Sequence, residues 1–409
     1  MTPALDLDFV RAQFPAFREP SLQGQAFFEN AGGSYTCQPV IDRLMRFYHT
    51  RKVQPYGAYP ASQAGGAEMD EARDRLAAMM GVAGDELSFG PSTTGNTYVL
   101  AQAFGEMLGA GDAIIVTDQD HEANSGPWRR LEARGIILRE WRIDPESGHL
   151  DPAALWDLID DKVRLVCFPH CSNVVGEVNP VADICARLRE AGIWSCVDGV
   201  SYAPHGLPDV GALGADIYLF SAYKTYGPHQ GLMVVRGGLG DVLPNQAHYF
   251  NAGTLYKRFT PAGPDHAQIA ACAGMADYID AFYAHHVGEQ AGPVTRARAV
   301  HDLMRAQETK LLTRLLDHLR GRNGIRLLGP DRAEGRAPTV AIGHRQPGLA
   351  MAQALAERGI MAGGGSFYAN RALGAMGIAP EHGVLRLSFV HYTSEAELDH
   401  LCDALDHLL

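Results

Sequence analysis

Long apolar runs are missing from this chain. No uncharged apolar stretch in its 409 residues approaches the roughly 18 residues that a membrane-spanning helix needs, so no membrane partner is expected. The opening segment, MTPALDLDFVRAQFPAF, lacks the basic stretch and apolar core of a secretory signal. A cytoplasmic location is therefore expected.

Positive charge is also in short supply. The sequence has 35 lysines and arginines against 47 aspartates and glutamates, a formal net charge of −12, and no basic run with interleaved aromatics. These features argue against a nucleic-acid partner. No GxGxxG pattern follows a first strand, which disfavours a nicotinamide-dependent enzyme.

Cysteines are few and scattered. The seven lie at positions 37, 167, 171, 185, 196, 272 and 402, without the spacing typical of a disulfide framework, so reduced thiols are expected. Cys167 and Cys171 share the segment CFPHC, but no second pair follows at the spacing of a zinc site. No metal is predicted.

The chain does contain an alternation of short apolar runs with longer helical segments. Helices are predicted between the runs, for example over 125–135 and 181–192. This alternation predicts an α/β fold with a mostly parallel sheet covered by helices. The runs predicted as buried strands are 112–117, 164–170, 194–200, 216–223 and 231–236.

The character of the sequence changes near residue 285, where a long helical stretch, 294–324, follows. We predict a large domain over 21–284 and a small α+β domain over 285–409, which packs with an N-terminal segment of residues 1–20. The glycine-rich segment 361–372 is predicted to be a loop that lines a site.

One lysine stands in an unusual place. Lys224 follows an apolar run in YLFSAYKTYGPHQG (218–231), although lysines are rarely buried. It is either a solvated loop lysine or a nucleophile held at the end of a buried strand. Ligands of open parallel sheets bind at the carboxyl ends of the strands. Other polar residues follow the predicted strands: His121, Asn173, Asp198 and Ser221.

Each of these polar residues also has a purely structural interpretation. Ser92, Thr93 and Thr94 suit the start of a helix, and the others suit turns or the core. Together, however, they supply what pyridoxal 5'-phosphate requires. The set offers a Schiff-base lysine, a carboxylate for the pyridine nitrogen, a flat side chain for stacking and a helix start for the phosphate.

The chain resembles the class V aminotransferase superfamily of fold-type I pyridoxal phosphate enzymes, in its cysteine desulfurase-like branch. The resemblance implies a mixed, mostly parallel seven-stranded sheet, a small C-terminal domain and a homodimer. It rests on the ordered segments FFENAGGSYTCQPV, FGPSTTGNTYVLA, DHEANSGPW, CSNVVGEVNP, VDGVSYAPHGLPDVGALGADIYLFSAYKTYGPHQG and VLRLSFVHYTSEAELDHL.

The resemblance also implies roles for single residues. Lys224 is the implied Schiff-base lysine and proton carrier, Asp198 the partner of the pyridine nitrogen and His121 the ring-stacking residue. The other implied contacts are Asn173 at the ring hydroxyl, Ser201 where relatives have glutamine, Thr93, Thr94 and Ser221 at the phosphate, Arg386 at the substrate carboxylate, and Asn30 and Ala31 beside the substrate.

The chain departs from the family pattern in its cysteines. Desulfurases carry a sulfur-accepting cysteine on a loop of the small domain, but the corresponding segment 361–377 has none. Cys402 is predicted to be a buried packing residue of the last helix. A persulfide relay is therefore not expected.

Several other positions leave alternatives open. Gly263 replaces the threonine of the Gly-Thr pair that reaches the partner subunit's phosphate, and Gly253-Thr254 is the rival segment. His229 either approaches the cofactor or shapes its turn. Tyr368 is a candidate proton donor or cover for the substrate, and Arg371 either binds a second anionic group or is exposed.

The sequence thus predicts a pyridoxal phosphate enzyme that acts on a small amino acid through Lys224 and a carbanion. We favour a lyase, by C–S cleavage or another β-elimination without a persulfide relay. Class V transamination comes next, and racemisation or epimerisation third. A cofactor-binding scaffold without turnover is the non-enzymatic alternative, which needs none of these side chains together.

Overall fold

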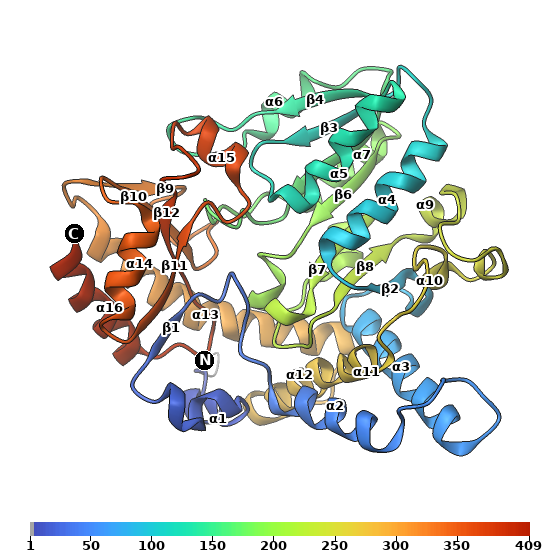
Figure 1. Ribbon diagram of the computed structural model, residues 1–409, viewed down its shortest axis with the longest axis horizontal. Coiled ribbons are helices and arrows are strands. Elements are labelled where there is room, and N and C mark those ends of the chain that lie inside the picture. The colour runs from blue at the N-terminus through green and yellow to red at the C-terminus, as the bar shows by residue number, and fades with distance from the viewer. Residues whose placement is uncertain (1–3) are drawn as a thin grey trace.

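The larger of two sheets has seven strands in the order β2-β8-β7-β6-β5-β3-β4 (Figure 1). The computed structural model describes residues 4–409. Strand β8 runs antiparallel to both of its neighbours, β2 and β7, and the other pairs are parallel, which confirms the predicted mixed and mostly parallel sheet. The strands are β2 (Leu87–Gly90), β3 (Ala113–Thr117), β4 (Ile137–Trp141), β5 (Val163–Pro169), β6 (Trp194–Asp198), β7 (Ile217–Ser221) and β8 (Gly231–Val235).

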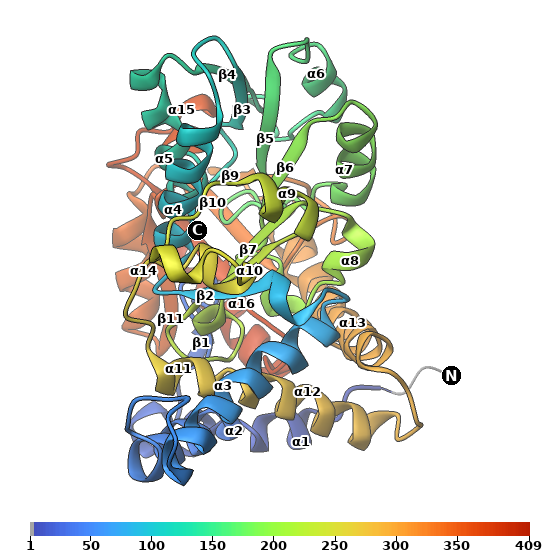
Figure 2. The same cartoon turned by 90° about the vertical axis from the view of Figure 1, so that its right-hand side faces the viewer.

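The five strands expected from the sequence are all present, and β2 and β4 are additional. Every residue of β3 and of β7 is buried, because helices cover both faces of the sheet. Figure 2 shows α4 (Thr93–Met107) and α5 (Gly126–Arg129) on one face, with α7 (Val181–Glu190) and α8 (Val210–Leu213) on the other.

Helix α7 illustrates how the sequence builds this covering layer. Val181, Ile184, Cys185 and Leu188 are its buried residues, a spacing that places them on one face of a helix. The helix is followed by Gly192 at φ +69°, a conformation that glycine adopts without strain.

The smaller sheet has five strands in the order β1-β11-β12-β10-β9. Strand β1 comes from the N-terminal part of the chain and pairs in parallel with β11, so this part of the small unit extends to Phe28, beyond the expected boundary at residue 20. The rest of the division into domains stays a prediction. The strands are β1 (Ala26–Phe28), β9 (Ile325–Leu328), β10 (Thr339–His344), β11 (Ile360–Gly365) and β12 (Val384–Ser388).

The glycine-rich segment was expected to be a loop from 361 to 372, and this expectation is wrong in part. Residues up to Gly365 form β11, and α15 (Asn370–Ala375) begins after a short turn over 366–369. A Cβ at Gly364 would lie 2.3 Å from the carbonyl oxygen of Gly348. The glycines therefore allow close packing of a strand.

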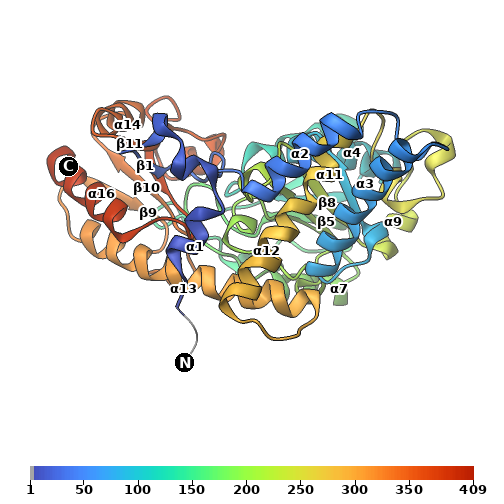
Figure 3. The same cartoon turned by 90° about the horizontal axis from the view of Figure 1, so that it is seen from below.

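Helix α13 (Pro293–Leu319) joins the two units, as Figures 1 and 3 show. Its first half contributes Val300 and Met304 to the core of the large unit. Its second half contributes Leu312 and Leu316 to the core beneath the small sheet. One continuous helix thus fixes the position of one sheet relative to the other.

The other helices complete the layers around the two sheets. The α-helices are α1 (Leu7–Ala12), α2 (Gln38–Thr50), α3 (Pro60–Met79), α6 (Pro152–Trp156), α9 (Gly237–Val242), α10 (Leu255–Arg258), α11 (His266–Ala271), α12 (Ala273–His286), α14 (Gly348–Ala356) and α16 (Glu395–Leu408). Short 3-10 helices cover Pro15–Arg18, Pro20–Leu22, Gly84–Glu86, Glu122–Asn124, Arg130–Arg134, Ala203–His205, Ala222–Lys224 and Tyr249–Asn251.

Two further properties concern the described residues as a whole. No helix between residues 4 and 409 is long and apolar enough to cross a membrane. Over the same residues, no group of three or more His, Cys, Asp or Glu side chains is arranged to hold a metal ion. All seven cysteines are free. The cytoplasmic location stays a prediction.

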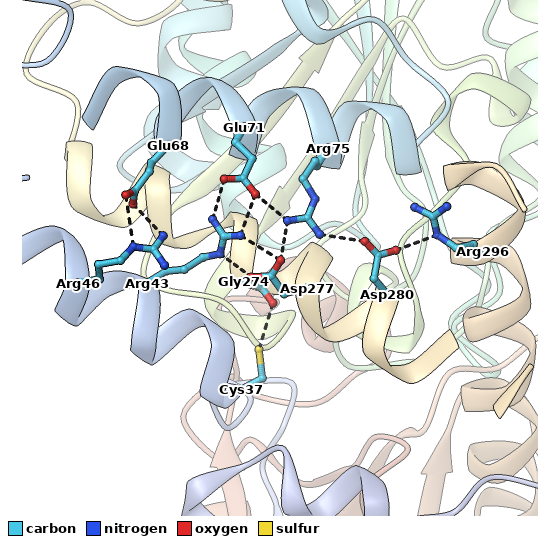
Figure 4. A network of polar contacts seen from close by, with 10 residues as sticks. All are labelled: Cys37, Arg43, Arg46, Glu68, Glu71, Arg75, Gly274, Asp277, Asp280 and Arg296. Carbon is cyan, nitrogen blue, oxygen red and sulfur yellow. Dashed lines mark hydrogen bonds and ion pairs between the residues drawn. The ribbon is translucent and has the colours of Figure 1, made fainter. Parts of the chain in front are cut away.

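An ion network connects α2, α3, α12 and α13 (Figure 4). Asp277 on α12 is at its centre, because it accepts hydrogen bonds from Arg43 of α2 and from Arg75 of α3. Shared charges of this kind stabilise more than an isolated exposed pair does. The network's residues on α2, α3, α12 and α13 include Arg43, Glu71, Arg75, Asp277, Asp280 and Arg296.

We predict that Asp277→Asn lowers the free energy of unfolding by about 1–2 kcal/mol, because two arginines lose one shared carboxylate. Urea denaturation at low and high salt measures the loss, which should shrink at high salt. The control is Asp317→Asn, which removes a single exposed pair with Arg320 and should change little. Equal losses in the two variants would contradict the prediction.

Candidate active site

Two adjoining cavities open at the carboxyl ends of β5, β6 and β7. The inner one has a volume of about 60 Å³ and the outer one about 530 Å³, and both are lined by Lys224, His121 and Asn173. All of the residues predicted to hold the cofactor line the inner cavity: Thr93, Thr94, His121, Asn173, Asp198, Ser201, Ser221 and Lys224. Their roles stay predictions.

The start of α4 lines the inner cavity with Ser92, Thr93 and Thr94. The Ser92 hydroxyl caps the helix by accepting from the Gly95 amide at 3.0 Å, and the Thr93 and Ser221 hydroxyl oxygens are 2.9 Å apart. A Cβ at Gly231 would lie 2.5 Å from the carbonyl carbon of Ser92, so glycine is needed for β8 to approach the turn. Hydroxyls beside a helix start suit a phosphate.

Asp198 is the carboxylate at the end of β6, and it is 5% exposed. Its Oδ1 accepts from the Val200 amide at 2.8 Å. Burial raises the pKa of Asp198 to about 6, although the Val200 amide and the Lys224 ammonium both oppose this rise. A nearby cation would favour the ionised form of this carboxyl group.

Asn173 and His121 flank the space between Asp198 and the outer cavity. The Asn173 amide nitrogen donates to the Phe367 carbonyl at 2.9 Å, whereas its buried Oδ1 has no hydrogen-bond partner within residues 4–409. Nδ1 of His121 accepts from the Ala123 amide at 3.0 Å. Burial, followed by Lys224 and Arg386, lowers the pKa of His121 to about 3, so its ring is neutral.

Lys224 is buried, as its apolar surroundings in the sequence suggested, with 8% of its surface exposed. Burial, followed by the Arg386 charge, lowers the pKa of Lys224 to about 8, and Asp198 and Glu29 oppose this shift. The backbone is held where the Ser34 hydroxyl donates to the Lys224 carbonyl. Tyr226, at φ +62°, anchors the same turn by donating to the Pro204 carbonyl.

Arg386 on β12 forms the wall that the small unit contributes. It is 3% exposed and donates to the Asn173 carbonyl at 3.2 Å and to Glu29 at 2.7 Å. The Phe367 ring covers its guanidinium at 3.8 Å. Glu29 and Phe367 were not predicted. Glu29 precedes Asn30 in a segment already singled out, but no local pattern indicates contact with Arg386.

The structure divides the predicted substrate residues into two groups. Ala31, Tyr368 and Arg386 line the outer cavity. Asn30 and Arg371 do not line either cavity. Asn30 holds its turn by donating to the Ser388 carbonyl at 3.3 Å, and Arg371 faces Glu122 at 3.4 Å.

The positions with open alternatives also have defined places. The His229 ring stacks on Tyr223 at 4.8 Å and lines neither cavity. Gly263 lines a separate recess, whereas Thr254 lines neither of the two cavities. Cys402 is half-buried against the core of the small unit, and burial raises its pKa to about 11.

The donor and acceptor set of the inner cavity fits pyridoxal 5'-phosphate. The unpartnered Asn173 oxygen suits a ring hydroxyl, the Asp198 carboxyl suits a ring nitrogen, and the start of α4 suits the phosphate. Lys224 supplies the amine that an aldehyde requires. These features define a fold-type I pyridoxal phosphate enzyme.

Comparison with known proteins identifies the family. The model of the Aminotransferase class-V family matches residues 26–258 and 296–401. The chain is 32% identical over 420 residues to an aminotransferase-like protein of Gibberella zeae, which covers 99% of both chains. It is 34% identical to a cysteine desulfurase of Serratia proteamaculans, over 69% of this chain and 74% of that protein.

A solved structure supports the fold. The cysteine desulfurase of Thermococcus onnurineus superposes with a TM-score of 0.86 at 23% identity, covering 100% of this chain and 99% of that one. The chain belongs to the class V aminotransferase family and is a pyridoxal phosphate-dependent enzyme.

We predict that burial of Lys224 makes folding depend on pH. Its pKa is lower in the folded protein than its ordinary 10.5, so the unfolded chain holds more protons between about pH 8 and 10.5. Folding therefore becomes more favourable as pH rises through that window. At pH 7, cofactor-free Lys224→Met should be more stable than the wild type by about 3 kcal/mol.

Denaturant titration of both proteins across this pH range measures the difference. The advantage of Lys224→Met should shrink as the pH approaches 10.5. The matched control, Lys162→Met, changes an exposed lysine and should show no such window. An advantage of Lys224→Met that is independent of pH would rule out the buried charge as its cause.

Proposed function

We propose that this enzyme is a lyase that breaks a bond at the β-carbon of a small amino acid. The observation that carries the proposal is the Lys224 amine. It lies in the cavity with its pKa lowered to about 8, and it makes no hydrogen bond to a described side chain. An amine with a pKa near neutrality exchanges protons readily, and this suits it to remove an α-proton.

The protein side chains divide the work around the substrate. Bound pyridoxal phosphate supplies an electron sink for negative charge that develops at the α-carbon. Asp198 holds the proton of the ring nitrogen, and the neutral His121 ring covers one face. Arg386 binds the substrate carboxylate. In an elimination, Lys224 takes the α-proton, and the β-substituent leaves with the bonding electron pair.

The cavity has no cysteine suited to a persulfide relay within residues 4–409. Cys171 lines the inner cavity, but burial raises its pKa to about 12. Its thiol lies 3.5 Å from the Gly176 carbonyl oxygen. A thiol of this kind stays protonated and is a poor nucleophile. This observation favours direct release of the leaving group.

Transamination is the second candidate. The aminotransferase-like protein of Gibberella zeae matches this chain over nearly its whole length. Transamination would use the same lysine, aspartate and arginine, with Lys224 returning the proton to a different carbon. Racemisation, in which the proton returns to the α-carbon, is third.

We expect that protein supplied with pyridoxal phosphate turns yellow and that borohydride bleaches the colour by reducing the Schiff base. Peptide mapping should then find the reduced cofactor, the label, on Lys224. Lys224→Ala should lose the label and Lys162→Ala should keep it. A panel of amino acids then separates the reactions. Elimination yields keto acid and the released β-substituent without an amino acceptor, whereas transamination requires stoichiometric acceptor. A label elsewhere would refute the assignment of Lys224.

We also propose that the enzyme is a homodimer. Tyr249 is 88% exposed, Phe250 is 69% exposed and Tyr56 is 52% exposed, and exposed aromatics of this kind are typical of an interface. Gly253-Thr254 and Gly263 lie close to Phe250 in the sequence, so the rival phosphate segments belong to the same region.

Light scattering should therefore find twice the mass of one chain, and Phe250→Asp should shift the protein toward the monomer because it buries a charge. Leu349→Asp, at an exposed apolar residue of α14, is the matched control and should stay dimeric. A wild-type mass of one chain would contradict the proposal.

A further inference from the structure

The guanidinium of Arg386 already holds a carboxylate. Nη2 donates to Oε1 of Glu29 at 2.7 Å, and Nη1 donates to the Asn173 carbonyl at 3.2 Å. Nε is buried without a partner within the described chain, and Phe367 covers one face of the group. A substrate carboxylate therefore finds no fully open edge of the guanidinium.

Glu29 is the more exposed member of this pair. Its side chain is 27% exposed and lines the outer cavity, whereas the Arg386 side chain is 3% exposed. The Glu29 backbone is bridged to Ser388 at the end of β12, so displacing the carboxylate requires a rotation of the side chain and no shift of the backbone.

The seat of the Glu29 carboxylate is closely shaped. Oε2 is buried and has no hydrogen-bond partner among residues 4–409. A Cβ at Gly363 would lie 2.3 Å from Oε2, and one at Gly32 would lie 2.8 Å from Oε1. Gly32 and Gly363 thus leave room for a carboxylate beside Arg386, although Oε2 of Glu29 has no hydrogen-bond partner there among the described residues.

We propose that Glu29 is a specificity-determining residue: an internal carboxylate that occupies the anion site of Arg386 and that the substrate carboxylate displaces. The exchange keeps the buried arginine compensated throughout, since one carboxylate replaces another. The internal competitor weakens binding of every carboxylate ligand. Only ligands with further contacts in the cavity then bind well.

This inference rests on the proposed function in one respect, namely that Arg386 faces the substrate. The binding test needs no turnover, so it still decides this proposal if the protein has no lyase activity. Sodium propionate is the probe, and propionamide is the uncharged probe of the same shape. Both are titrated calorimetrically into the cofactor-loaded protein at constant ionic strength.

Glu29→Gln should bind propionate about tenfold more tightly than the wild type, because a charged hydrogen bond no longer competes. Propionamide affinity should not change. The KM for an amino-acid substrate should fall by a similar factor, because the internal competitor is lost from the free enzyme. Arg386→Ala should abolish the preference for propionate over propionamide.

Two further variants guard against indirect effects. Glu190→Gln removes the same charge from an exposed position on α7 and should leave propionate affinity unchanged. Glu29→Asp keeps the charge but shortens the reach to Arg386, so it should also bind propionate more tightly than the wild type. This variant provides the test if Glu29→Gln fails to fold. Unchanged or weaker propionate binding in both Glu29 variants would overturn the proposal, because it would make the ion pair a fixed part of the wall.

Discussion

The arrangement of the site depends on one physical constraint, the burial of the ammonium group of Lys224. Lys224 loses most of its hydration at the end of β7, and only nearby opposite charge offsets that cost. Asp198 and Glu29 supply the offset, while Arg386 adds to the cost. These groups come from β6, from the segment after β1, and from β12, so both sheets have to be in place before the lysine has its lowered pKa.

The position of the small sheet therefore affects the pKa of Lys224, because it places Arg386 and Glu29 beside the lysine. Helix α13 carries apolar residues for both cores, and a cluster of aromatic rings closes the junction beside it. Phe14 contacts Tyr226, Tyr278 and Tyr392 at centroid distances of 4.8–5.8 Å. Tyr226 belongs to the turn that follows Lys224, so packing of the N-terminal segment supports the turn that carries this lysine.

Much of the large unit was predictable because its signals are local. Buried parallel strands are short β-branched runs, and side chains that follow such strands meet at one edge of a sheet. His121, Asn173, Asp198, Ser221 and Lys224 were singled out in this way, and all of them line the inner cavity. The glycine run at β11 was misread, since glycines of a loop and glycines of a closely packed strand look alike in sequence. The orientation of Arg371 was equally open, because the sequence does not indicate whether a charged side chain near a turn points into a cavity or toward solvent.

The sequence by itself determined the class of fold and, through its resemblance to known segments, the family and the predicted cofactor residues that line the inner cavity beside Lys224. These follow from hydrophobic periodicity and from motifs in which neighbouring residues act together. Only the tertiary structure decided that Glu29 occupies Arg386 and that Asn30 supports a turn instead of lining the cavity. Glu29 and Arg386 are 357 positions apart. Contacts across such a separation depend on how two sheets dock, and docking leaves no periodic trace in the chain.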